Sequence, residues 1–202
     1  MYDYHVLLGI LAIIAGLVGE VLYIKDIVRG TIKPHPFSWF GWGILDVIIL
    51  SAQTVRGGGA GAWVMGVAAV VNIGIAIASL RRGEKRITQS DWICFIGALL
   101  GIGLWIVTDD PFWAVIVAAV VNCVAFIPTF RKSFVRPFEE SLTIFVFDII
   151  KFGLSIVALQ ALNPTTALFP AVSAISNIVF VAMVLFRRRQ LAKRGRGDTP
   201  RQ

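Results

Sequence analysis

Residues 18–38, VGEVLYIKDIVRGTIKPHPFS, align without gaps over residues 121–141, VNCVAFIPTFRKSFVRPFEES, at an offset of 103 residues. The match brings charges, prolines and loop length into register together, which apolar bias alone does not explain. We therefore read the chain as two copies of one unit. The aligned pairs include Tyr23 with Phe126, Arg29 with Lys132, Lys33 with Arg136, Pro34 with Pro137 and Ser38 with Ser141.

The composition is that of a membrane protein. Hydrophobic residues make up 57% of the 202 positions, charged residues only 15%, and the mean hydropathy is +0.79. The charges form short clusters between long uncharged stretches, as a bilayer requires of the segments that cross it. We expect an all-α integral membrane protein without a soluble domain, because the connections are short.

Seven stretches are apolar enough to span a bilayer, for which about 20 residues are needed. One stretch separates the two repeats, so both copies have the same orientation, and the pattern predicts a 3+1+3 arrangement of two parallel three-helix bundles. The expected spans are 5–24, 37–55, 60–80, 92–108, 112–130, 142–161 and 166–186. The expected divisions are 1–88 for the first repeat, 89–110 for the linker helix, 111–188 for the second repeat and 189–202 for a disordered basic cytoplasmic tail.

The basic residues predict the orientation. All lysines and arginines except Arg56 and Lys151 fall in the first, third and fifth connections or after the last span. Because cytoplasmic loops are enriched in lysine and arginine, the N-terminus is expected outside and the C-terminus in the cytoplasm. We expect a multi-pass protein of the cell (inner) membrane. The same placement argues against nucleic-acid binding despite the net charge of +7.

Two asparagines are candidate substrate ligands. Asn72 and Asn177 lie near the midpoints of the third and seventh spans, at nearly the same spacing from their repeats. Their amides offer a donor and an acceptor, which suits a hydroxyl of a sugar or ribose. The alternative is an interhelical hydrogen bond. Asn122 lacks an aligned partner and is assigned that structural role.

Charged residues inside the spans are costly and mark pathways or pairs. Asp46 could carry a proton in coupled transport or pair with Lys151. Asp148 lies three residues before Lys151, so an ion pair on one helix face is expected. Glu20 is expected to form a local salt bridge with Lys25.

The aromatic residues at segment ends are expected to anchor the protein at the membrane interface. Trp42 is nearly a turn deeper, and we single it out as a stacking platform. The residues assigned to the interface are Tyr23, Trp39, Trp63, Trp92 and Trp113.

The stretch FIPTFRKSFVRPFEESLTIF, residues 126–145, resembles a segment of the SWEET and PQ-loop transporters, in which a proline, a Lys-Ser pair and a Pro-Phe pair follow one another. The matching positions are Pro128, Lys132, Ser133, Pro137 and Phe138. The 3+1+3 layout and the orientation are similar too, so the resemblance covers nearly the whole chain. The PnuC vitamin transporters are similar in layout, and WFGW, with Trp39 and Trp42, is similar to their Trp-rich site.

The SWEET resemblance implies that Asn72 and Asn177 face each other across the substrate pocket. It also implies that Trp42 and Phe145 sandwich the substrate. Pro34, Pro128 and Pro137 would act as hinges, whereas Lys25 stands where that family has its first-helix proline.

We therefore expect a transporter that moves a small polar solute, a sugar or similar, by alternating access through a midplane site. The alternatives are a PnuC-like nucleoside or vitamin carrier, or a non-transport seven-helix receptor or assembly protein. An enzyme, a metal site and a cofactor are not expected, since the chain has only His5 and His35 and no clustered metal ligands. The expected partners are the solute and the lipid bilayer, for a monomer or homo-oligomer.

Overall fold

Seven α-helices and two short 3-10 helices make up the described part of the chain. The computed structural model describes residues 3–29, 36–82, 89–139 and 142–197, and these contain no strand. The helices are α1 (Tyr4–Val28), α2 (Pro36–Val55), η1 (Gly59–Ala62), α3 (Trp63–Arg82), α4 (Gln89–Thr108), α5 (Pro111–Val135), η2 (Pro137–Glu139), α6 (Thr143–Val157) and α7 (Pro164–Gly197).

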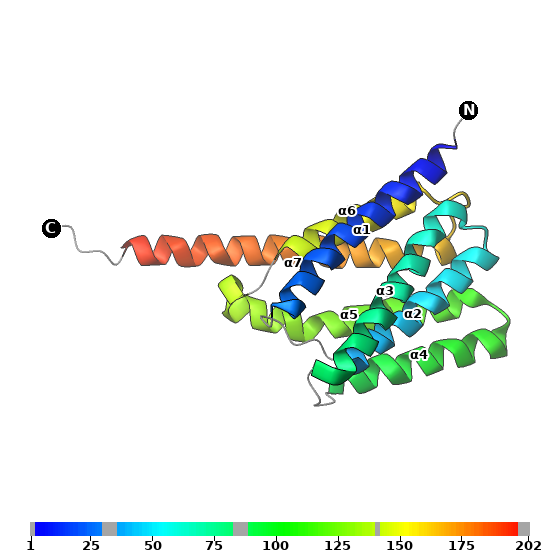
Figure 1. Ribbon diagram of the computed structural model, residues 1–202, viewed down its shortest axis with the longest axis horizontal. Coiled ribbons are helices and arrows are strands. Elements are labelled where there is room, and N and C mark those ends of the chain that lie inside the picture. Colours follow the sequence, from blue (N-terminus) through cyan, green and yellow to red (C-terminus); the bar gives the residue numbers. More distant parts are fainter. Residues whose placement is uncertain (1–2, 30–35, 83–88, 140–141, 198–202) are drawn as a thin grey trace.

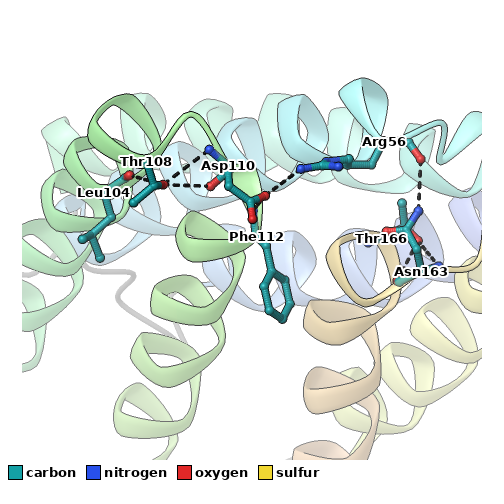
Figure 2. A network of polar contacts seen from close by, with 7 residues as sticks. All are labelled: Arg56, Leu104, Thr108, Asp110, Phe112, Asn163 and Thr166. Carbon is teal, nitrogen blue, oxygen red and sulfur yellow. Dashed lines mark hydrogen bonds and ion pairs between the residues drawn. The ribbon is translucent and has the colours of Figure 1, made fainter.

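Helices α5 and α7 each begin at a proline that follows a capping residue. Asp110 accepts a hydrogen bond at Oδ1 from the backbone N–H of Phe112 at 3.1 Å, and Asn163 accepts one at Oδ1 from that of Thr166 at 3.1 Å (Figure 2). Proline needs no donor at the first helical position, and the capping oxygen satisfies a free N–H of the first turn. Local sequence therefore determines where these two helices start.

The outer surface is apolar. Large hydrophobic side chains are exposed along the helices, and Val107 is 83% exposed. Four segments are long and apolar enough to cross a membrane, and two shorter helices are apolar as well. The prediction of an all-α protein with membrane-length apolar helices is therefore confirmed. The long segments are Tyr4–Lys25, Gly59–Leu80, Pro111–Val135 and Pro164–Ala192, and the shorter ones are Trp39–Val55 and Phe95–Thr108.

We call α1–α3 the first group and α5–α7 the second, and the helix contacts within the two groups follow the same pattern. In the first group α3 packs against both α1 and α2, and in the second α7 packs against both α5 and α6. The groups meet where α1 packs along α6 and where α2 packs on α5, and α1 and α6 lie side by side in Figure 1. Helix α4 packs on α5 and α2. These two contacts each join the first helix of one group to the second helix of the other, and α2 also contacts α7.

The start of α1 and the end of α7 lie at opposite ends of the bundle (Figure 1). The N-terminal end holds the start of α1 and the connections after α2, α4 and α6. The C-terminal end holds the ends of α1, α3 and α5, and α7 projects beyond it. Helix α7 continues to Gly197, into the region 189–202 for which the sequence predicts a basic tail. Arginine, leucine, glutamine and alanine are good helix formers, so the helix propagates past its apolar part.

Candidate functional site

A cavity of about 470 Å³ lies between the two groups of helices. Its wall is built from α1, α2 and α3 on one side and from α5, α6 and α7 on the other. The buried side chains of Met65 and Phe169 belong to its wall near the start of α3 and α7. Lys25 and Arg29, which are exposed, line it at the end of α1. The cavity therefore opens at the C-terminal end of the bundle.

Both candidate asparagines line this cavity. Asn72, on α3, donates a hydrogen bond from Nδ2 to Oδ2 of Asp46, on α2, at 2.7 Å. Asn177, on α7, is buried and donates from Nδ2 to the carbonyl of Ser173 one turn earlier at 2.8 Å. Its Oδ1 has no hydrogen-bond partner among the described residues. Asn177 thus has a free acceptor, whereas the Asn72 amide already binds a carboxylate.

The charged residues of the spans gather in the same wall. The predicted pair is present, because Lys151 Nζ lies 2.6 Å from Oδ1 of Asp148. The aliphatic chain of Lys151 crosses α1 at Gly16, where a Cβ would lie only 2.7 Å from Cδ of that lysine. Glycine at this position therefore allows the lysine to reach the middle of the bundle.

Two charge assignments need correction. Glu20 is buried, lines the cavity and has no partner at Oε2 among the described residues, so the expected salt bridge with Lys25 is wrong. Glu20 instead lies within Coulombic range of Lys151 and Asp148, both on α6, which the sequence spacing does not reveal. For Asp46 the sequence allowed two roles, carrying a proton or pairing with Lys151. In the structure the close polar contact of Asp46 is with Asn72, and the close ion pair of Lys151 is with Asp148.

Aromatic rings from both halves line the cavity. Trp42, the predicted stacking platform, meets Trp39 edge-on with 5.2 Å between ring centroids, and Trp39 lies 5.0 Å from Tyr23. Phe145, the second predicted platform, lies in the opposite wall. The interface assignment of Trp39 is wrong, because its side chain is buried in this cluster. The cluster forms where Tyr23 of α1 and Trp39 of α2 pack together with Ile75 of α3, which local sequence does not show.

The candidate hinge prolines lie in different settings. Pro34 lies outside the described residues. Helix α5 continues through position 128 to Val135, and Pro137 is buried at the start of η2. Pro170, which sequence reasoning missed, is buried inside α7. A proline in a helix interior removes one backbone donor and can mark a bend.

Close backbone contacts shut the N-terminal end. The carbonyl of Gly61, in η1, accepts a hydrogen bond from the hydroxyl of Ser155 at 3.0 Å, and its N–H donates to the carbonyl of Ala158 at 3.1 Å. The connections after α2 and α6 also bond to each other, since the N–H of Gln160 donates to the carbonyl of Gly58 at 3.2 Å. These contacts join the two groups of helices where the cavity ends.

A polar network covers the same end (Figure 2). Arg56 Nη2 lies 2.7 Å from Oδ1 of Asp110, which links the connection after α2 to the start of α5. The carbonyl of Arg56 accepts a hydrogen bond from Nδ2 of Asn163 at 3.1 Å, which adds the start of α7. Three connections from both halves are thereby tied together.

Three further polar groups line the cavity wall; sequence reasoning missed Ser173 and assigned Glu20 and Asn122 to other contacts. Glu20 Oε2, Ser173 Oγ and Asn122 Nδ2 all face it without a hydrogen-bond partner among the described residues. The cost of a polar atom in hydrocarbon was a usable signal for each of them. Together with Asn177 they offer a solute several acceptors and one amide donor from both halves.

Comparisons with protein-family models, with curated proteins and with solved structures found no match for this chain.

Proposed function

We propose that the protein is a membrane transporter that moves a small polar solute, a sugar or similar, by alternating access through a site between two three-helix bundles. The observation that carries this proposal is the cavity of about 470 Å³, whose wall contains both Asn72 and Asn177. Buried polar groups without partners are costly, so a cavity that collects them fits a site in which a solute supplies the missing hydrogen bonds.

The packing of the helices supports a 3+1+3 arrangement of seven spans in two parallel repeats. In each group the third helix packs between the first and the second, and the contacts of α1 with α6 and of α2 with α5 are equivalent under exchange of the repeats. We assign the N-terminus to the outside of the cell membrane and the C-terminus to the cytoplasm, because lysine and arginine gather at the C-terminal end.

The asymmetry of the cavity supports alternating access. It opens at the C-terminal end, and the Gly61–Ser155 contact and the Arg56–Asp110 ion pair lie at the other. With this orientation, the described conformation faces the cytoplasm. Rocking of one bundle against the other would break these contacts and close the mouth instead. Pro170 and the SWEET-like hinge positions Pro128 and Pro137, together with Pro34, are where the bundles would flex.

Asp46 is the residue that we assign to proton coupling, if the carrier is coupled. It is buried at the middle of α2, and its close partner is the neutral amide of Asn72. A carboxylate in that position can exchange a proton with water in the open cavity, whereas a uniporter would need no such group.

A nucleoside or vitamin solute, as in the PnuC-like alternative, is the second candidate. The observation in its favour is the pair Trp39 and Trp42 in the cavity wall, which with Phe145 opposite could stack on a planar ring. A receptor or assembly protein of seven helices would bind the same solute without moving it.

Counterflow into proteoliposomes tests the proposal. Vesicles preloaded with a sugar or a nucleoside should take up the labelled solute faster than vesicles without protein. Asn177→Ala and Asn72→Ala should each reduce uptake by roughly tenfold or more, the effect of losing a hydrogen bond to a buried polar group. Ile178→Ala, an exposed neighbour of Asn177 on α7, is the matched control and should transport normally. Binding without uptake would reject a carrier and leave a receptor.

A further inference from the structure

The cavity wall carries more negative than positive charge at mid-depth. Glu20 and Asp46 are buried there, Asp148 is half-buried, and Lys151 is the one buried lysine among the described residues. The other two basic residues of the wall belong to the exposed mouth, where water screens them. The middle of the cavity thus holds three carboxyl groups and one ammonium group.

The ammonium group of Lys151 does not pair closely with all three carboxyl groups. Lys151 forms its ion pair with Asp148 at 2.6 Å. Asp46 accepts from a neutral amide, and Glu20 Oε2 accepts from nothing among the described residues, although Lys151 lies within Coulombic range of both. Uncompensated carboxylates inside a membrane protein are expensive, so a second cation in this space would stabilise them.

The other free polar atoms and the aromatic rings point to an organic cation. Asn177 Oδ1 is a free acceptor, Ser173 Oγ can accept, and both side chains are 2% exposed and line the cavity. The rings of Trp39 and Trp42 lie in the same wall. Aromatic faces and carboxylates together attract substituted ammonium ions, and the amide donor Asn122 Nδ2 is outnumbered by these acceptors in the wall.

We propose that the solute of this cavity is a small organic cation, of the substituted ammonium type, held between the Glu20 and Asp46 carboxylates and the Trp39–Trp42 rings. This inference rests on the proposed carrier function and names the chemical class of its solute. Glu20 would take the cationic centre, because it is the buried carboxylate with an unpartnered oxygen. Trp42 would cover the apolar part of the ion.

Matched pairs of probes test the charge directly. The thermal unfolding of the purified full chain is followed with choline against 3,3-dimethylbutan-1-ol, in which carbon replaces the charged nitrogen. Acetylcholine against 3,3-dimethylbutyl acetate, its neutral carbon analogue, forms a second pair. We expect the Tm to rise with concentration for at least one cation and to stay unchanged with its neutral partner. NaCl and MgCl₂ at the same ionic strength should not reproduce the rise.

Variants connect that response to the cavity. Glu20→Gln and Asp46→Asn should each weaken the Kd of the cation about tenfold or more, because hydrogen bonds to charged groups are the stronger ones. Both keep the size of the side chain and one acceptor oxygen, so they should fold, which the unfolding curve without probe checks. Asp109→Asn removes an exposed carboxylate outside the cavity at a positive φ of 52°, which asparagine adopts readily, and should bind as the wild type does.

The outcomes separate this inference from the carrier proposal. Equal shifts from a cation and its neutral partner, no shift from either cation, a shift from the metal salts alone, or unchanged cation affinity in both variants would each overturn it. Counterflow of a neutral sugar by a protein that ignores both cations would keep the carrier and reject the cationic solute. Cation binding without counterflow would keep the cationic ligand and reject the carrier.

Discussion

Gln53, on α2, donates its side-chain amide to the backbone carbonyl of Thr166, on α7, at 2.7 Å, and both residues are fully buried. In a regular helix that carbonyl would bond the N–H four residues later, but position 170 is a proline. A side chain of one half therefore satisfies the backbone group that a proline of the other half leaves free. This bond crosses between the halves near the shut end of the cavity.

The Gln53 bond predicts a coupling between two distant positions. Gln53→Leu should lower the free energy of unfolding by about 1–3 kcal/mol, because the buried carbonyl loses its donor. In a chain that also carries Pro170→Ala, the restored N–H of residue 170 can donate to the Thr166 carbonyl. The cost of Gln53→Leu should therefore be smaller in that chain. Thermal unfolding of the four proteins of this double-mutant cycle measures the difference, and strictly additive effects would contradict the assigned bond.

Gly61→Ala should open the N-terminal end. A Cβ at position 61 would lie 2.7 Å from the carbonyl oxygen of Ser155 and 2.8 Å from the backbone N of Leu159, and neither backbone atom can move freely. Overpacking of this kind costs about 1–3 kcal/mol, and about 1.4 kcal/mol is enough for a tenfold shift between two conformations.

Labelling of a cysteine in the cavity measures that shift. With Cys94 and Cys123 replaced by alanine, Ser173→Cys should react about tenfold faster with an impermeant maleimide applied from the N-terminal side when Gly61→Ala is present. Gly74→Ala is the matched control, since a Cβ there meets nothing within 4 Å. Equal rates in the two variants would argue against a gate at η1.

The two asparagines should differ in their effect on stability. Asn72→Ala removes the amide that donates to Asp46, so we expect a loss of about 1–3 kcal/mol. Asn177→Ala removes only a bond to its own helix and should cost less than about 1 kcal/mol. Thermal unfolding without solute measures both, and Asp46→Asn should reduce the cost of Asn72→Ala. A larger loss for Asn177→Ala than for Asn72→Ala would be inconsistent with the assigned contacts.

Asp110 has two separable roles. It pairs with Arg56 and caps α5 through the N–H of Phe112. Asp110→Asn keeps a capping oxygen and loses the ion pair, whose side chains are 45% and 40% exposed, so it should cost well under about 1 kcal/mol. Asp110→Ala loses the cap too and should cost about 1 kcal/mol more. Arg56→Gln is the control for the ion pair alone and should match Asp110→Asn in unfolding experiments at low and high salt.

Much of the architecture could be predicted from local sequence. Apolar stretches of membrane length predicted helices close to those observed, and Asp-Pro and Asn-Pro steps occur where α5 and α7 begin. The Asp148–Lys151 pair was predictable because both residues belong to one helix face. The extent of α7 was not predictable, because the basic and polar residues that follow its apolar part are common both in exposed helices and in disordered tails.

The sequence by itself determined which segments are helical and apolar, because burial in lipid and backbone hydrogen bonding act on each segment separately. Only the tertiary structure decided the partners of the polar groups in the interior: Glu20 in the cavity wall without one, Gln53 on the carbonyl before Pro170, and Trp39 buried beside Trp42. These depend on how each helix is rotated and how closely it approaches another, and that is set by small-residue contacts between segments far apart in the chain, such as Gly16 beneath Lys151.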